Sequence, residues 1–223
     1  MDDVIYAHYP VFRSTPELRA MPDADRTQAC HDADVLLKEW EDRVTVRGAY
    51  STAGFRADAD LMMWWVARSP ADVQDLLVAF RRTELGRRLE LTWAFMGAVR
   101  PAEFTADHAP AFVKGDAPRT YLCVYPFVRT PEWYLLPPDE RGRLLRDHGV
   151  IGREYPDVLA NTTSAFGIND WEWILAFEAD DLIRILDCIR ALRAAEARRY
   201  TKVEVPFVTG IRKEPAQAFQ DLA

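Results

Sequence analysis

The chain has 223 residues, 49% of them apolar, so it can bury a hydrophobic core in one large domain or two small ones. Its 28 Lys and Arg against 35 Asp and Glu give a net charge of −7, which disfavours a protein that wraps a nucleic-acid backbone. The sequence has no secretory signal and no apolar run long enough to span a bilayer. We therefore expect a cytoplasmic protein with no nucleic-acid or membrane partner.

The first hundred residues predict the order β-α-β-β-α-β. Alternating and β-branched residues predict strands, and apolar residues at helical spacing predict helices. Asp23 is the expected N-cap of the first helix, and Ser69 with Pro70 is expected to open the second. The predicted elements are strand 4–13, helix 23–41, strands 44–53 and 61–67, a helix from 70, and strand 89–99.

The segment 101–118 interrupts this pattern. It contains three prolines, a glycine and charges of both signs, which is typical of a linker or a long functional loop. The order of elements then repeats, and a polar tail at 211–223 is expected to be loose. The predicted elements of the second half are strand 120–129, helix 137–149, strands 158–166 and 171–177, helix 180–198 and strand 203–209.

The repeated order indicates an internal duplication. Tyr9-Pro10-Val11-Phe12-Arg13 resembles Tyr125-Pro126-Phe127-Val128-Arg129, one in each half. We expect an α+β fold with two ferredoxin-like units, 1–100 and 119–210, whose sheets pair into a β-barrel with outer helices. A ligand would then lie between the sheet and the helices of one unit.

The three cysteines predict buried free thiols in a reducing compartment. Cys30, Cys123 and Cys188 are odd in number, far apart and surrounded by apolar residues. The sequence has no CxxC pair and no Cys/His spacing typical of zinc, and it lacks the common nucleotide-binding and hydrolase motifs.

One histidine stands apart from the others. His148 follows Leu144 by four residues and Leu145 by three, which places it on the apolar face of the predicted helix. It is either a satisfied core histidine near a helix C-terminus or a proximal haem ligand, and spacing alone leaves both open. His8 and His31 are expected to be structural or solvated.

A tyrosine and an arginine share one face of the strand 120–129. Alternation puts Tyr125 and Arg129 on the same side, where an arginine suits an anion, although a packed tyrosine with an arginine at the rim explains the pattern too. Trp133 follows closely. His108 lies in the connecting loop and is either a surface histidine or, if the loop covers a pocket, a proton acceptor.

Long motifs of the chain resemble the coproheme decarboxylases of actinobacteria, in the chlorite dismutase-like superfamily. The segment YLCVYPFVRTPEWYLLPPDERGRLLRDHG carries the resemblance most clearly, and VRGAYSTAGFRADADLMMWW, YPDVLANT, DWEWILAFEADDL and EVPFVTG extend it over nearly the whole chain. The resemblance implies a homopentamer with one iron porphyrin site per chain, in the C-terminal unit. It also implies a transient contact with coproporphyrin ferrochelatase.

The implied reaction converts iron coproporphyrin III (coproheme) to haem b with hydrogen peroxide as oxidant, by removing the carboxyl groups of two propionates. The resemblance makes His148 the axial iron ligand and Tyr125 the residue that becomes a radical and attacks a propionate. It makes Arg129 a propionate-binding residue and His108 the distal base. Trp133 lies next to the implied pocket.

The resemblance leaves rival functions open. Chlorite dismutases carry a distal arginine after the ligand-bearing helix, and other decarboxylases carry a glutamine there, whereas residues 158–170 contain no Lys, Arg or Gln. This pattern argues against chlorite chemistry and makes the peroxide side depend on His108. The alternatives are a haem peroxidase or chlorite-degrading enzyme on the same fold, or a non-catalytic haem carrier or sensor.

Overall fold

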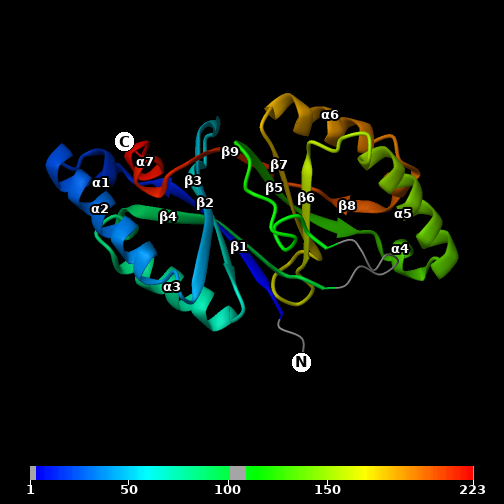
Figure 1. Ribbon diagram of the computed structural model, residues 1–223, viewed down its shortest axis with the longest axis horizontal. Coiled ribbons are helices and arrows are strands. Elements are labelled where there is room, and N and C mark those ends of the chain that lie inside the picture. Colours follow the sequence, from blue (N-terminus) through cyan, green and yellow to red (C-terminus); the bar gives the residue numbers. More distant parts are fainter. Residues whose placement is uncertain (1–3, 101–108, 223) are drawn as a thin grey trace. The chain divides into compact units, whose positions relative to one another are not determined.

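The computed structural model describes residues 4–100 and 109–222, and the chain divides into two compact units (Figure 1). The first unit combines the residues up to Val99 with those from Val208 onward, and the second unit runs from Arg100 to Phe207. Both units have the β-α-β-β-α-β order expected from the sequence, so the α+β class is confirmed. Within the described ranges, every helix is too short or too polar to cross a membrane.

The first unit is an antiparallel sheet in the order β4-β1-β3-β2-β9. Helices α2 and α3 cover one face of it, and β9 and α7 are contributed by the end of the chain (Figure 1). Its elements are β1 Tyr6–Ser14, α1 Pro16–Arg19, α2 Asp23–Glu39, β2 Val44–Arg56, β3 Ala59–Ala67, α3 Pro70–Arg82, the 3-10 turn η1 Gly86–Arg88, β4 Leu89–Ala98, β9 Val208–Lys213 and α7 Pro215–Gln220.

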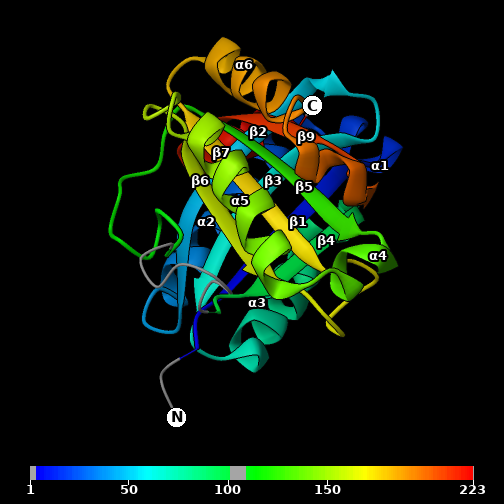
Figure 2. The same ribbon diagram turned by 90° about the vertical axis from the view of Figure 1, so that its right-hand side faces the viewer.

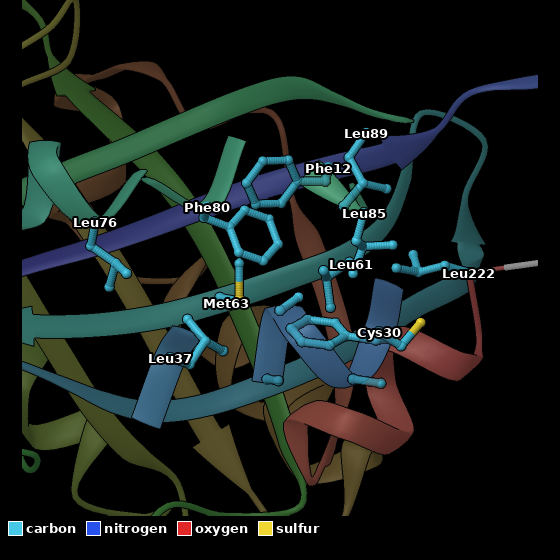
Figure 3. Packing of buried hydrophobic residues seen from close by; sticks show 14 of the residues in the cluster. Phe12, Cys30, Leu37, Leu61, Met63, Leu76, Phe80, Leu85, Leu89 and Leu222 are labelled. Atoms are coloured by element: carbon cyan, nitrogen blue, oxygen red, sulfur yellow. The ribbon is translucent and has the colours of Figure 1, made fainter. Parts of the chain in front are cut away.

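Aromatic and aliphatic side chains fill the space between this sheet and its helices (Figure 3). Phe80 of α3 lies at the centre, with its ring centroid 5.4 Å from that of Phe12 and 6.3 Å from that of Trp65. Because the first unit is packed with its own large side chains, a flat ligand between its sheet and helices would have to displace them.

The second unit is an antiparallel sheet in the order β6-β7-β5-β8, the ferredoxin-like order of the first unit read from the other edge. Helices α5 and α6 lie on the same face of this sheet, and α5 lies in front of the strands in Figure 2. Its elements are β5 Tyr121–Arg129, α4 Pro131–Leu135, α5 Pro138–Gly152, β6 Leu159–Ser164, β7 Trp173–Ala179, α6 Leu182–Leu192, the 3-10 turn η2 Glu196–Tyr200 and β8 Thr201–Val203.

Several predicted boundaries are wrong. The N-cap of α2 is Pro22 and not Asp23, and α5 continues through Gly149 to Gly152. The helix predicted over 180–198 ends at Leu192 and is followed by η2. The helix α4 between Thr130 and Leu136 is not anticipated by the sequence pattern.

The end of the chain differs most from the prediction. The single strand expected over 203–209 is two strands: β8 pairs with β5 in the second unit, and β9 pairs with β2 in the first. The tail expected to be loose contains α7, in which Phe219 is 0% exposed, and Leu222, which follows this helix, is 1% exposed. The tail is therefore part of the core of the first unit, because its apolar residues are buried there.

The similar segments around Tyr9 and Tyr125 do not place these two tyrosines at equivalent positions in the two units. Tyr125 faces the helices of its unit and packs in a cluster with Ile185 and Cys188 of α6. Tyr9 contacts Trp64 on the opposite face of its sheet from Phe12, with ring centroids 5.0 Å apart. The duplication of the fold is thus not a duplication of the candidate site.

Candidate functional site

Tyr125 is buried in the second unit between the sheet and α6. Its side chain is 3% exposed. Its ring stacks on Phe207 at a centroid distance of 4.5 Å and 30° between planes, and it meets Phe177 edge-on at 5.8 Å. Burial, with smaller contributions from Cys123 and Glu204, raises the pKa of Tyr125 well above its ordinary value. The phenol is therefore held neutral and in a fixed orientation.

Arg129 lies four residues after Tyr125, at the end of the same strand. Its guanidinium lies over the ring of Trp133 at 4.1 Å and over that of Phe127 at 4.6 Å, and its Nη1 donates to the carbonyl oxygen of Ala197 at 3.0 Å. Burial lowers its pKa to about 10. Arg129 is thus a partly desolvated cation that keeps its charge at neutral pH, which suits a ligand carboxylate.

The helix that carries His148 packs beside these residues. Trp133, which is 4% exposed, forms a small apolar cluster with Leu144 of α5 and Ala197 of η2, and Leu145 and Tyr200 border it. Because His148 follows Leu144 by four residues, it lies on the same side of α5, where its side chain is half-buried. Because α5 extends to Gly152, His148 lies about one turn before the end of the helix.

Glu172 ties the end of β5 to α4 and was not anticipated from the sequence. Its Oε2 accepts a hydrogen bond from the backbone N–H of Arg129 at 2.7 Å and another from the hydroxyl of Tyr134 at 2.6 Å. Its own N–H donates to the carbonyl oxygen of Phe127 at 3.3 Å. Glu172 therefore fixes the backbone from which Arg129 and Trp133 project.

The segment between β8 and β9 also reaches this region. Phe207 stacks on Tyr125, and Glu204 forms ion pairs with Arg193 and Arg198. Both residues belong to the segment EVPFVTG, but the sequence predicts no site role for either, because both lie far from Tyr125 in the sequence.

The structure brings most of the predicted site residues to one side of one sheet. Tyr125, Arg129 and Trp133 follow each other on β5 and α4, and His148 projects from the helix that packs on Trp133. His108 lies outside the described residues. His8 is 4% exposed in the core of the first unit, and His31 is exposed on α2, in line with their expected structural or solvated roles.

The three cysteines are free and buried, as predicted. Cys123 and Cys188 belong to the apolar cluster around Tyr125. Burial raises the pKa of Cys188 to about 11, so this thiol is protonated at neutral pH.

This donor set fits an iron porphyrin. A half-buried imidazole suits an axial iron ligand, a desolvated guanidinium suits a carboxylate, and apolar and aromatic side chains suit the flat face of a macrocycle.

The chain resembles a known protein family over most of its length. The family model described as chlorite dismutase matches residues 26–213. A protein of Mycolicibacterium smegmatis named coproheme decarboxylase is 52% identical over 190 residues, which are 84% of this chain and 82% of that protein. A coproheme decarboxylase of Staphylococcus carnosus is 26% identical over 201 residues, 81% of this chain and 80% of that protein.

Among solved structures, a chlorite dismutase from Candidatus Nitrospira defluvii in complex with imidazole superimposes with a TM-score of 0.89. The match covers 98% of this chain and 94% of that one at 23% identity, so it shows a shared fold and no more. The chlorite dismutase-like fold expected from the sequence is confirmed.

Proposed function

This chain belongs to the chlorite dismutase family, and we propose that its second unit decarboxylates coproheme with the residues Tyr125, Arg129 and His148. The observation that carries the function is the 52% identity to a coproheme decarboxylase over 84% of this chain. The chain is accordingly an oxidoreductase of haem synthesis. A chlorite-degrading activity is not favoured, since the segment 158–170 has no arginine.

In this proposal His148 would coordinate the iron and Arg129 would bind a propionate, with Trp133 packed against the Arg129 guanidinium. Iron coproporphyrin III would supply both the redox centre that reacts with hydrogen peroxide and the propionates that are decarboxylated. Each decarboxylation removes carbon dioxide and a hydrogen from a propionate and leaves a vinyl group, while peroxide is reduced to water. Two such events give haem b.

Tyr125 is proposed as the reacting residue of the chain. Because burial disfavours its phenolate, the phenol must lose its proton together with its electron when it is oxidised. The resulting radical can take a hydrogen atom from the β-carbon of a propionate that Arg129 holds nearby. His108 is proposed as the base that takes a proton from the incoming peroxide.

We also propose that the protein is a cytoplasmic homopentamer that receives coproheme through transient contact with coproporphyrin ferrochelatase. The family resemblance of the motifs supports this proposal. Measuring the molar mass of the purified protein by light scattering tests the pentamer directly.

The function is tested by mixing the protein with ferric coproporphyrin III, adding peroxide stepwise and determining the mass of the porphyrin. The expected result is loss of two carboxyl groups through an intermediate that lacks one.

Tyr125→Phe should bind coproheme within about threefold of the native affinity and lose at least about 100-fold in conversion rate, because phenylalanine has no O–H to oxidise.

Tyr121→Phe is the matched control, since Tyr121 lies on the same strand and borders the same apolar cluster. It should convert coproheme at the native rate. Full conversion by Tyr125→Phe would show that another residue reacts with the propionate. An unchanged porphyrin with the native chain would favour a carrier, sensor or peroxidase.

A further inference from the structure

Glu204 is a nearly buried carboxylate shared by two arginines in the second unit. Its side chain is 14% exposed, and its Oε2 lies 2.6 Å from Nη1 of Arg193 and 2.5 Å from Nη1 of Arg198. Each arginine is 37% exposed, so both retain N–H donors that face solvent. The arrangement is a pair of guanidinium groups whose charge is only half neutralised by the carboxylate between them.

This cluster adjoins the proposed site. Glu204 directly follows β8, where Val203 pairs with Val128 and Thr201 pairs with Arg129. Three residues after Glu204, Phe207 stacks on the ring of Tyr125. Arg198 lies on η2, next to Ala197, whose carbonyl oxygen accepts the hydrogen bond from Arg129.

The negative charge of Glu204 contributes to the pKa shifts of both Tyr125 and Arg129. Burial raises the pKa of Tyr125, and the negative charge of Glu204 adds to this rise. Burial lowers the pKa of Arg129, and the same charge opposes that fall. A carboxylate that interacts with Arg129 in this way must also repel a ligand carboxylate that Arg129 binds.

We propose that Glu204 competes with porphyrin carboxylates for Arg193 and Arg198, which it occupies until a ligand carboxylate takes the place of the Glu204 carboxylate. The inference rests on the proposed function. Glu204 then lowers the affinity for a porphyrin with four carboxylates more than the affinity for a porphyrin with two. By limiting the free positive charge of the site, Glu204 also favours release of the dicarboxylic product.

The test is equilibrium binding to Glu204→Gln, followed by porphyrin absorbance and intrinsic fluorescence without peroxide. Glutamine keeps the shape and removes the charge. Affinity should rise about tenfold for ferric coproporphyrin III and about threefold for haem b, because the gain grows with the number of ligand carboxylates. Haem b should also dissociate more slowly from the variant.

Two further variants control for damage to the fold. Glu204→Asp keeps the charge and should keep the native ratio of the two affinities. Asp157→Asn removes a carboxylate from an exposed bidentate pair with Arg184 in the same unit and should change neither affinity. The thermal unfolding temperature of each ligand-free variant reports whether the fold is intact.

Unchanged affinities of a folded Glu204→Gln variant would overturn the proposal, and so would equal loss of affinity for both porphyrins. These outcomes differ from failure of the proposed function, in which the native chain itself would not bind or convert coproheme. If Glu204→Gln does not fold, loss of the native affinity ratio in the folded Glu204→Asp variant would contradict the proposal.

Discussion

Burial gives Tyr125 and Arg129 complementary properties. The phenol of Tyr125 is neutral at neutral pH because desolvation penalises its charged form. The guanidinium of Arg129 keeps its charge, since even its lowered pKa of about 10 lies well above neutrality. The same strand therefore presents a neutral group that can give up a hydrogen atom and a cation that can hold an anion.

Arg129→Gln should weaken binding of ferric coproporphyrin III by about 10- to 100-fold, because a charge-assisted hydrogen bond to a carboxylate is lost. Arg129→Lys should lie between this variant and the native chain, since lysine keeps the charge without the planar fork. Arg143→Gln is the control, because Arg143 pairs with Asp147 and Glu196 at the surface. Native affinity in Arg129→Gln, measured by absorbance titration, would assign the propionate to another residue.

His8 is a buried histidine whose Nδ1 has no hydrogen-bond partner among the described residues. Its ring lies 5.7 Å from that of Trp65, and burial lowers its pKa to about 4 from an ordinary value of 6.5. Between these pH values the unfolded chain binds a proton that the folded chain excludes. The contribution of His8 to stability is therefore complete above pH 6.5 and falls as the pH decreases toward 4.

This difference predicts a loss of about 3 kcal/mol in the free energy of unfolding across that pH range. His8→Phe should reduce the pH dependence by that amount, and His31→Gln, which replaces an exposed histidine, is the control. Urea unfolding at several pH values measures both. If the His8→Phe chain keeps the native pH dependence, other groups cause it.

At the scale of elements, α3 shows how a short local signal fixes a helix. Pro70 is the first helical residue, and the Ser69 side chain accepts a hydrogen bond from the N–H of Asp72. The apolar face that follows this cap buries Val73, Leu76 and Phe80 against the sheet. Cap and apolar spacing are both local, so the sequence predicts this helix start correctly.

Ser69→Ala should lower the free energy of unfolding by about 1 kcal/mol, because the N–H of Asp72 loses its capping oxygen. Ser69→Asp restores an acceptor at the same position and should recover most of the loss. Thermal and urea unfolding measure the difference. An alanine variant as stable as the native chain would mean that solvent replaces the cap without cost.

Element ends that depend on distant contacts could not be predicted. The pattern of residues 180–198 is helical throughout, yet α6 ends at Leu192. Beyond that point Arg193 and Arg198 meet Glu204, and Ala197 packs under Trp133. These partners come from other parts of the chain, and tertiary contacts override a local preference for helix.

The residues of the candidate site also fall into those that the sequence predicts and those that it does not. Tyr125, Arg129 and Trp133 could be singled out because they lie within nine residues on one strand and the helix after it. Glu172, Glu204 and Phe207 could not, because only the sheet topology brings them to β5. A single glutamate between apolar residues carries no local sign that it binds a distant backbone group or arginine.

At the scale of the whole molecule, the first unit is completed by the end of the chain. The strand β9 pairs with β2, and the hydroxyl of Ser14 donates to the carbonyl oxygen of Leu222 at 3.1 Å. Phe219 stands 6.0 Å from Phe80, centroid to centroid. The polar composition of the tail suggests a solvated end, but its few apolar residues are the ones that are buried.

Phe219→Ala should therefore destabilise the chain by about 3–5 kcal/mol, as expected for a large side chain removed from a packed core. Gln217→Ala is the control on the same helix, because Gln217 is exposed.

Since Tyr125, Arg129 and His148 all belong to the second unit, the coproheme affinity of the Phe219→Ala chain below its unfolding transition should stay within about threefold of native. Thermal unfolding and porphyrin titration measure the two properties separately. A Phe219→Ala chain with native stability would show that α7 is dispensable to the core, whereas a large loss of affinity would show that the two units are coupled.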